Sequence, residues 1–430
     1  MKNKKKKTIL ILIPILVFVI LGSVVIYISY KTGKNDANKI SASVNSTNVD
    51  IKTCGNPITT YKGADGKKKK IYSCLENYII TKENNSKLFR AMQNFAITKD
   101  YIYFSTAFDL DDTVKGTSRT YVVRVDRKTG VKKQMHVNYA GHAQSFDAVT
   151  NGTYKITKGN KIIVDQLFMN GFSNDLSKEG TFRGVYYTTF GSGLRYQANS
   201  IAIKRKSIKT GKTTKKQLQF KKISSKDNKY KDKETGKFSN TLFYNALKSY
   251  GSNSSYMTNP ELAVSPDGKT IAFAKTINGG FDGGNAEIYV YSMKDFKKLN
   301  GNKILYQYNI QYIGNKQGVE IDDKYLYIWS EYKGKKIEKK GEHFISLYKY
   351  NLKTGKQVGG TVLTEDYLTG LANRVTGIAK NQNKDFPNGK SYNSFEAEGM
   401  SVYDGKVYVG IVYRGDGLKS INNIYMIDGV

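Results

Sequence analysis

A pattern of twelve or thirteen residues that recurs five times constrains the fold of this chain more than any single residue does. Three copies, 93–104, 317–328 and 398–409, match position for position. Two further copies, 144–156 and 261–273, have one additional residue in the turn. Each copy reads as a short alternating strand, a turn of Asp, Asn, Gly or Lys, and a second strand rich in Tyr, Ile and Val. Repetition on this scale predicts a repeat architecture.

A second hairpin signal follows each copy. Strand-like segments that end in a Lys-Thr-Gly turn occupy 121–130, 201–211 and 345–355, and segments 287–295 and 423–429 hold the same place in the other units. Glycine supplies the positive φ angle of a tight reversal. Five opening and five closing hairpins predict an all-β fold, a five-bladed β-propeller of four-stranded antiparallel sheets over 88–430. A β-sandwich with similar hairpins is the alternative, but the regular alternation of the two signals favours the propeller.

The N-terminal residues predict a membrane anchor. Residues 1–7 contain five lysines, and an uncharged, apolar run of 23 residues follows at 8–30. At 1.5 Å per residue, such a run is long enough to cross the ~30 Å hydrocarbon core of a bilayer. Lysines are retained on the cytoplasmic side, so we expect a cytoplasmic basic tail at 1–7, one transmembrane helix at 8–30, and an extracellular remainder. The alternative is a cleaved signal peptide, whose apolar region typically has about 7–15 residues.

Residues 31–87 are polar and irregular, and this composition predicts a flexible extracellular tether. The tether includes the two cysteines of the chain, Cys54 and Cys74. In an exported protein two such cysteines are expected to form a disulfide. The closed loop would contribute ~3 kcal/mol on the chain-entropy estimate. A metal site would need further ligands at suitable spacing.

The charge of the chain is strongly positive. Lys and Arg number 69 against 36 Asp and Glu, a formal net charge of +33. A basic stretch at about 212–250 reads as an insertion on the rim between the second and third blades, with Lys215, Lys216, Lys221 and Lys222 as candidate polyanion ligands. A solvated loop without a ligand is the alternative. Nucleic acid does not fit an extracellular compartment, and no nucleic-acid-binding motif is present. Anionic wall polymers such as teichoic acid, or anionic lipid head groups, fit better.

Several short motifs resemble the helveticin J family of class III bacteriocins. They are Gln93–Ile97, Gly141–Phe146, Glu261–Asp267, Gln317–Ile321 and Glu396–Val402, in that order along the chain. The resemblance covers about 88–430 and implies a five-bladed propeller. It also implies a role in killing or binding neighbouring Gram-positive cells. A membrane anchor is a departure from a secreted bacteriocin, and it favours a surface-displayed relative. We expect the protein to be monomeric.

The sequence contains few groups for catalysis or for cofactor binding. The three histidines, His136, His142 and His343, are too few for a zinc site of several histidines. No nucleophile elbow, phosphate-binding loop or dinucleotide motif occurs. Oxygen-bearing residues at 281–287 could hold Ca²⁺, although a glycine-rich hairpin is the better explanation of this segment. We therefore expect no cofactor.

One set of polar residues occupies the same position in each opening hairpin. The propeller fold predicts that the first strand of each blade lines a central channel. The residues are Gln93, Gln144, Glu261, Gln317 and Glu398, with His142 two positions before Gln144. They would form a polar ring whose role is structural, hydrogen-bonded to backbone and water, or else a sugar or cation site.

Two classes of function remain after these observations. The first is a binding module for an anionic wall glycopolymer, in which aromatic rings and lysines supply affinity. The second is an enzyme that acts on wall carbohydrate or phosphodiester. For a glycosidase, Glu261 and Glu398 would be the carboxylate pair. The sequence favours the binding module.

Overall fold

The computed structural model describes residues 54–55, 57–62, 68–78, 80, 91–109, 118–138, 144–155, 161–174, 181–190, 195–196, 199–210, 213–223, 230–231, 238–239, 261–278, 284–298, 303–333 and 343–430. The predicted anchor at 8–30, His142 and the first three residues of the predicted calcium loop, 281–283, lie outside these ranges. Among the helices within them, none combines the length and the apolar character that crossing a membrane requires.

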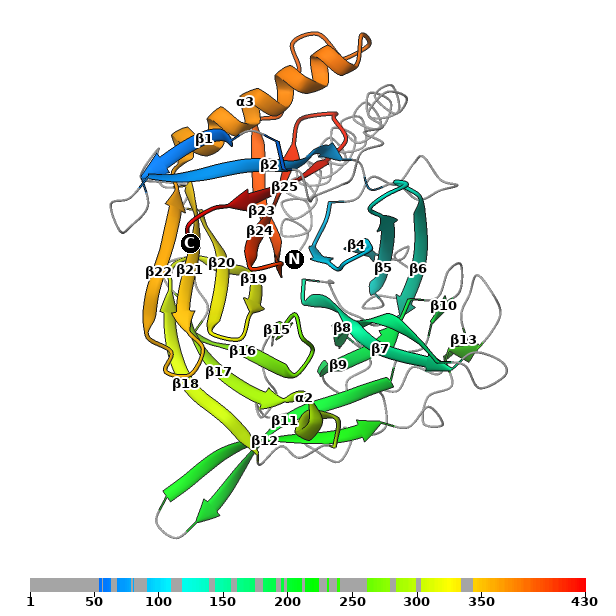
Figure 1. Cartoon of the computed structure of the whole chain (residues 1–430), viewed down its shortest axis with the longest axis vertical. Helices are drawn as coiled ribbons and strands as arrows, with labels where there is room; N and C mark the ends of the chain where they lie inside the picture. Colours follow the sequence, from blue (N-terminus) through cyan, green and yellow to red (C-terminus); the bar gives the residue numbers. More distant parts are fainter. Residues whose placement is uncertain are drawn as a thin grey trace, which may run out of the picture.

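Small, mostly antiparallel sheets are arranged around one axis in the manner of a propeller (Figure 1). The innermost strand of each large sheet contacts the innermost strands of its two neighbours. These contacts run from β3 (Asn94–Ile97) to β7 (Phe146–Lys155), β15 (Glu261–Val264), β19 (Asn315–Ile321) and β23 (Ser394–Tyr403), and then back to β3. The all-β, propeller-like fold predicted from the repeats is therefore confirmed.

Each large sheet continues outward from its inner strand. Sheet 1 adds β4 (Tyr101–Asp109), β5 (Ser118–Asp126), β6 (Lys132–Asn138) and β10 (Arg195–Tyr196); sheet 2 adds β8 (Lys161–Asn174), β9 (Thr181–Thr189), β11 (Asn199–Thr210) and β12 (Thr213–Ile223). Sheet 3 adds β16 (Thr270–Asn278), β17 (Gly284–Ser292) and β18 (Ile304–Tyr312); sheet 4 adds β20 (Tyr325–Lys333), β21 (His343–Asn351) and β22 (Gln357–Leu363). Sheet 5 adds β24 (Lys406–Arg414), β25 (Ile421–Ile427), β2 (Lys68–Tyr78) and β1 (Pro57–Lys62). A separate two-stranded sheet pairs β13 (Tyr230–Lys231) with β14 (Phe238–Ser239).

The predicted hairpins lie where their turn chemistry places them. The Lys-Thr-Gly turns after β5 and β21 are closed by the side chains of Asp126 and Asn351, which accept hydrogen bonds from backbone N–H groups two and three residues later. Gly130 and Gly355 both have a φ of 70°. The expectation of four strands in every sheet was right for sheets 3 and 4 and wrong for the other three, which have a fifth strand.

Sheet 5 joins the two ends of the described chain. Strand β2 pairs with β25, so that Ile71 lies opposite Ile427, and β1 pairs with β2. The prediction that 31–87 is only a tether was therefore wrong for Pro57–Lys62 and Lys68–Tyr78, because these two strands complete the sheet begun by β23–β25. Cys54 and Cys74 form the expected disulfide, which links the residues before β1 to β2.

Large apolar side chains fill the interfaces between sheets. Trp329 is fully buried between sheets 4 and 5, and its indole N–H donates to the carbonyl of Gly410. Helix α3 (Glu365–Gln382) runs along the outside near β1 (Figure 1). It buries Leu368, Leu371, Ala372 and Val375, which share one face of the helix. A second, short helix, α2 (Met293–Lys297), is capped by the Ser292 hydroxyl. Neither helix was predicted.

Candidate functional site

Each inner strand has one edge that pairs with no other strand of its own sheet. Side chains on or beside the adjacent inner strands form hydrogen bonds with the backbone N–H groups of that edge. An edge strand has backbone N–H groups without partners in its own sheet. The hydroxyl of Ser145, directly before β7, accepts from Leu262 N at 2.8 Å, and a carboxylate oxygen of Asp147, on β7, accepts from Val264 N at 2.6 Å. Sheets 2 and 3 are therefore joined by polar contacts that replace strand pairing.

Hydrogen bonds between side chains and backbone groups also join sheets 5, 1 and 2. The Asn94 side chain accepts from Met400 N at 3.2 Å and donates to Gln144 O at 2.7 Å, and the Ser401 hydroxyl accepts from Ile97 N at 3.1 Å. Gly399 has a φ of 72°, and a Cβ added there would overlap Asn94. These residues act as scaffold, because each satisfies a backbone group that would otherwise be buried without a partner.

The five residues of the predicted polar ring meet in pairs. Gln93 donates to a Glu398 carboxyl oxygen at 3.2 Å, and Gln144 donates to the Gln317 amide oxygen at 3.3 Å. The second bond joins the segment before β7 to β19, and these two inner strands are not neighbours around the axis. Glu261 pairs with neither couple. The predicted ring is therefore two separate contacts plus Glu261, and His142, its sixth proposed member, lies outside the described residues.

Glu261 forms a buried ion pair with a residue that the sequence reasoning missed. Its carboxylate lies 3.7 Å from the Lys316 ammonium, which also donates to Ala274 O at 3.0 Å and to Thr276 Oγ1 at 3.2 Å. Burial raises the pKa of Glu261 to about 7, against the effect of the lysine, and burial lowers the pKa of Lys316. Lys316 directly precedes Gln317, a member of the predicted ring, and this position in the sequence could have indicated that Lys316 lies near the ring.

Further carboxyls near the axis are also buried. Burial raises the pKa of Asp147 to about 7. Burial, and then the charge of Asp147, raise the pKa of Glu320. Oxygen atoms of Gln93, Glu261, Glu320 and Glu398 are buried without a hydrogen-bond partner. Within the described ranges, no three His, Cys, Asp or Glu residues are grouped so that they could hold a metal ion.

A charged cluster lies between sheets 4 and 5; we call it the interface cluster. It comprises Glu331, Lys333, His343, Glu396 and Arg414. His343 Nε2 is 2.7 Å from Glu331, and the Lys333 ammonium lies 3.3 Å from Glu331 and 3.8 Å from Glu396. The Arg414 guanidinium lies 2.7 Å from Glu396. Strand pairing of Lys333 with His343 and of Ser394 with Arg414 brings these residues to neighbouring strand ends.

The interface cluster borders the Gln93–Glu398 pair. Burial raises the pKa of Glu398 well above its usual value, and the nearby charges of Glu396 and Glu331 raise it further while Arg414 and Lys333 oppose them. The His343 ring stacks on Phe395 at 4.4 Å. Sequence reasoning missed the cluster because its members come from two sheets. The one local signal was that β20 ends with two charged residues, Glu331 and Lys333.

The four candidate lysines of the polyanion site lie on a blade. Lys215, Lys216, Lys221 and Lys222 belong to β12, the outermost strand of sheet 2, where Lys215 is opposite Ile208 and Lys222 is opposite Ile201. The expectation of an insertion outside the repeat was therefore wrong for 213–223. The predicted closing segment 201–211 corresponds to β11, and β12 is a further strand that pairs with β11 at the outer edge of sheet 2.

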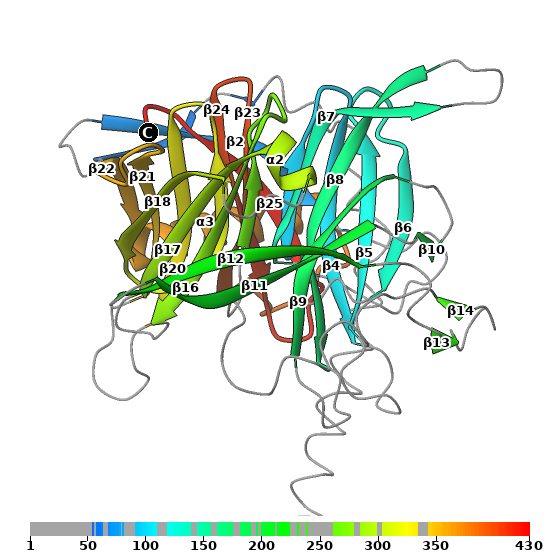
Figure 2. The same cartoon turned by 90° about the horizontal axis from the view of Figure 1, so that it is seen from below.

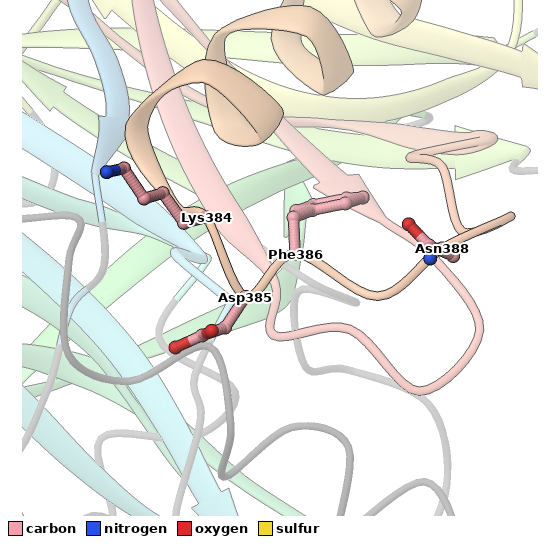
Figure 3. Close-up of a pocket in the computed structure, with 4 residues that line it drawn as sticks. All are labelled: Lys384, Asp385, Phe386 and Asn388. Atoms are coloured by element: carbon pink, nitrogen blue, oxygen red, sulfur yellow. The ribbon is translucent and has the colours of Figure 1, made fainter.

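An open pocket of about 510 Å³ lies in the segment that follows α3. Its described lining residues are Lys384, Asp385, Phe386 and Asn388. Their side chains point in different directions (Figure 3), so they do not converge on one ligand group. Phe386 is buried and packs near Tyr392, which accounts for it as core.

No family model and no curated protein matches the chain. Among solved structures, the chain is similar to the tail fiber of Staphylococcus aureus phage P68, with a TM-score of 0.43, 13% identity, and coverage of 82% of this chain and 52% of that chain. It is also similar to the Bombyx mori GH32 beta-fructofuranosidase BmSUC1 (TM-score 0.34, 11% identity, 76% and 57% covered). A third is the WD40 domain of SCAP from fission yeast (0.27, 10%, 86% and 91%). The chain spans about half the length of the phage tail fiber and 57% of the fructofuranosidase.

Proposed function

We propose that the chain is a membrane-anchored, extracellular propeller of five blades that binds an anionic cell-wall glycopolymer such as teichoic acid. The proposal combines the apolar run at 8–30, the charge of +33 and the resemblance to helveticin J-like bacteriocins. The five sheets of four or five strands support the blade number. An antibacterial role belongs to the same proposal, because binding to the wall of a neighbouring cell is its first step.

The observation that carries the proposal is a basic ribbon on sheet 2. Strand β11 pairs with β9 over Asn199–Ala202, whereas its pairing with β12 continues to Thr210 opposite Thr213. Strand residues 203–210 and 213–220 therefore extend past the last contact with β9 as a two-stranded ribbon. Figure 1 shows the ribbon projecting beyond the outer edge of the propeller. In the view of Figure 2 the ribbon crosses in front of other strands.

The ribbon is basic along its whole length. Between residues 203 and 220 the sequence has seven Lys or Arg residues and no Asp or Glu, and Lys221 and Lys222 follow directly. Like charges on paired strands repel one another, so this composition is unfavourable for the ribbon by itself. A polyanion would relieve the repulsion, and an accumulation of one charge attracts such a partner over a distance.

The test replaces Lys215, Lys216, Lys221 and Lys222 by Gln and measures association with purified walls across a salt series. Each exposed charge contact contributes up to ~1 kcal/mol, so we expect affinity at low salt to fall about tenfold or more. Residual binding should depend less on salt, because exposed charges are screened within ~8–10 Å at physiological ionic strength.

A matched control removes the same charge elsewhere. Lys128, Lys353, Lys356 and Lys406 are exposed lysines in turns or at a strand end. Their replacement by Gln should leave wall association close to that of the parent protein. Equal loss in both variants would mean that total charge, and not the ribbon, governs binding. Unchanged binding in the variant that lacks these four β12 lysines would overturn the proposal for this site.

An enzyme remains the second candidate function, but not with the carboxylate pair expected from the sequence. Glu261 is held by Lys316, and Glu398 by Gln93. The interface cluster offers a different arrangement of groups, and its contacts favour a different chemistry.

A further inference from the structure

We propose that the interface cluster is a phosphodiester-hydrolysing site in which His343 is the general base. The inference rests on the proposed function for its choice of substrate, since wall teichoic polymers are joined through phosphodiesters. It uses none of the ribbon residues, however. A binding ribbon and a hydrolytic cluster can therefore fail or succeed separately.

The geometry provides an imidazole oriented by a buried carboxylate. The Glu331 side chain is 2% exposed and lies 2.7 Å from His343 Nε2. A carboxylate can only accept a hydrogen bond, so Nε2 carries the proton and Nδ1 is the basic nitrogen of the neutral ring. Among the described residues, no group forms a hydrogen bond with Nδ1. A base oriented by a third group is the arrangement that activates nucleophiles in many hydrolases.

The imidazole is also held in place on its other sides. Its ring stacks on Phe395 at an interplanar angle of 25°, and the backbone N–H of His343 donates to Glu365 at the start of α3. The His343 side chain keeps 22% of its surface exposed. It is therefore both fixed in orientation and accessible to a water molecule.

The flanking cations select the class of reaction. Lys333 and Arg414 are 46% and 47% exposed, and Glu396 contacts both of them. Cations stabilise the negative charge of a transferring phosphoryl group. They would destabilise the oxocarbenium-like transition state of glycoside cleavage, which requires two suitably placed carboxyl groups. The cluster therefore favours a phosphodiester over a glycosidic bond.

In the proposed step, His343 Nδ1 takes a proton from water as the water oxygen forms a bond to phosphorus. The bond from phosphorus to the leaving alkoxide breaks, and the imidazolium returns the proton to that alkoxide. The products are one phosphomonoester and one alcohol, so one water is consumed for each diester cleaved. Glu331 acts as a positioning residue, and Lys333 and Arg414 hold the non-bridging phosphate oxygens.

The experiment measures hydrolysis of bis(4-nitrophenyl) phosphate by the full chain in detergent, with release of 4-nitrophenol as the readout. We expect His343→Gln to lower kcat at least 100-fold, within the range for loss of a general base. Lys333→Gln should raise KM without changing the melting temperature, because this side chain is half exposed. Lys353→Gln, on a distant turn, should have no effect.

Glu331→Gln tests the positioning role through the separation of kcat from KM. The amide keeps the shape of the carboxylate, but it no longer fixes which ring nitrogen of His343 carries the proton. We therefore expect kcat to fall about tenfold or more while KM stays close to that of the parent chain. A merely structural role would lower the melting temperature and would not lower kcat selectively.

Absence of turnover by the parent chain between pH 5 and 9 would overturn the inference, as would full activity in His343→Gln. Wall association distinguishes this failure from failure of the proposed function. If His343→Gln binds walls like the parent chain, the binding proposal stands whichever way the hydrolysis assay falls.

Discussion

Gln93 and Glu398 form a buried contact between the first and the last sheet of the propeller, and the protonation state of Glu398 affects how well this contact is hydrogen-bonded. Gln93 directly precedes β3, and Glu398 lies on β23; these are the inner strands of the first and last sheets in chain order. Gln93 donates to one Glu398 oxygen, and the other oxygen of Glu398 and the amide oxygen of Gln93 are buried without partners. A protonated Glu398 could donate to Gln93 and satisfy both atoms. The raised pKa of Glu398 favours that protonated form.

Glu398→Gln should therefore change how stability depends on pH. A carboxyl whose pKa is raised in the folded state binds more protons than in the unfolded chain, where the pKa is about 4.3, so the free energy of unfolding falls as pH rises above that value. Glutamine resembles the protonated carboxyl and does not ionise. In urea unfolding, we expect the variant to match the parent protein within ~1 kcal/mol at pH 4.5 and to exceed it at pH 8.

The matched control is Glu396→Gln, two residues earlier on β23. Glu396 is partly exposed and forms ion pairs with Lys333 and Arg414, so its loss should not produce a gain at pH 8. Parallel pH curves for the parent protein and Glu398→Gln would show that Glu398 is ionised in the folded protein and would refute the closure account.

At the scale of elements, the hairpins could be predicted because their turns depend on residues close together in the sequence. Strand pairings between distant parts of the chain could not be predicted. The turns after β5 and β21 depend on Asp126, Asn351 and nearby glycines, all within a few residues. The pairing of Ile71 with Ile427 joins opposite ends of the chain, and no local pattern announces it. The disulfide was predictable from the count and spacing of cysteines. Its place beside the closing strands was not.

Replacing both Cys54 and Cys74 by Ser should lower the free energy of unfolding by ~3 kcal/mol, because the disulfide closes a loop over a separation of 20 residues in the unfolded chain. Strand β2 covers β25, so the loss should be measured as an earlier transition of the whole sheet. Urea unfolding with and without reductant checks this. The double variant should not respond to reductant; a parent protein equally indifferent to reductant would contradict the estimate.

On the scale of the whole molecule, the repeated hairpins predicted the architecture, while only part of the candidate site could be predicted. The repeated Gln and Glu positions do lie on or beside the inner strands, yet they are tied to one another or to Lys316. The four candidate lysines do lie close together in sequence, but on a strand of sheet 2 rather than in an insertion. The interface cluster depends on how sheets 4 and 5 pack against each other, and the periodicity of strands in the sequence does not predict that packing.

The most direct measurement is association of the protein with purified Gram-positive walls before and after chemical removal of their teichoic acids. The account predicts strong binding to intact walls at low salt, progressive release as salt increases, and little binding to the stripped walls. Equal binding to intact and stripped walls would contradict it, because the ligand would then not be the anionic polymer.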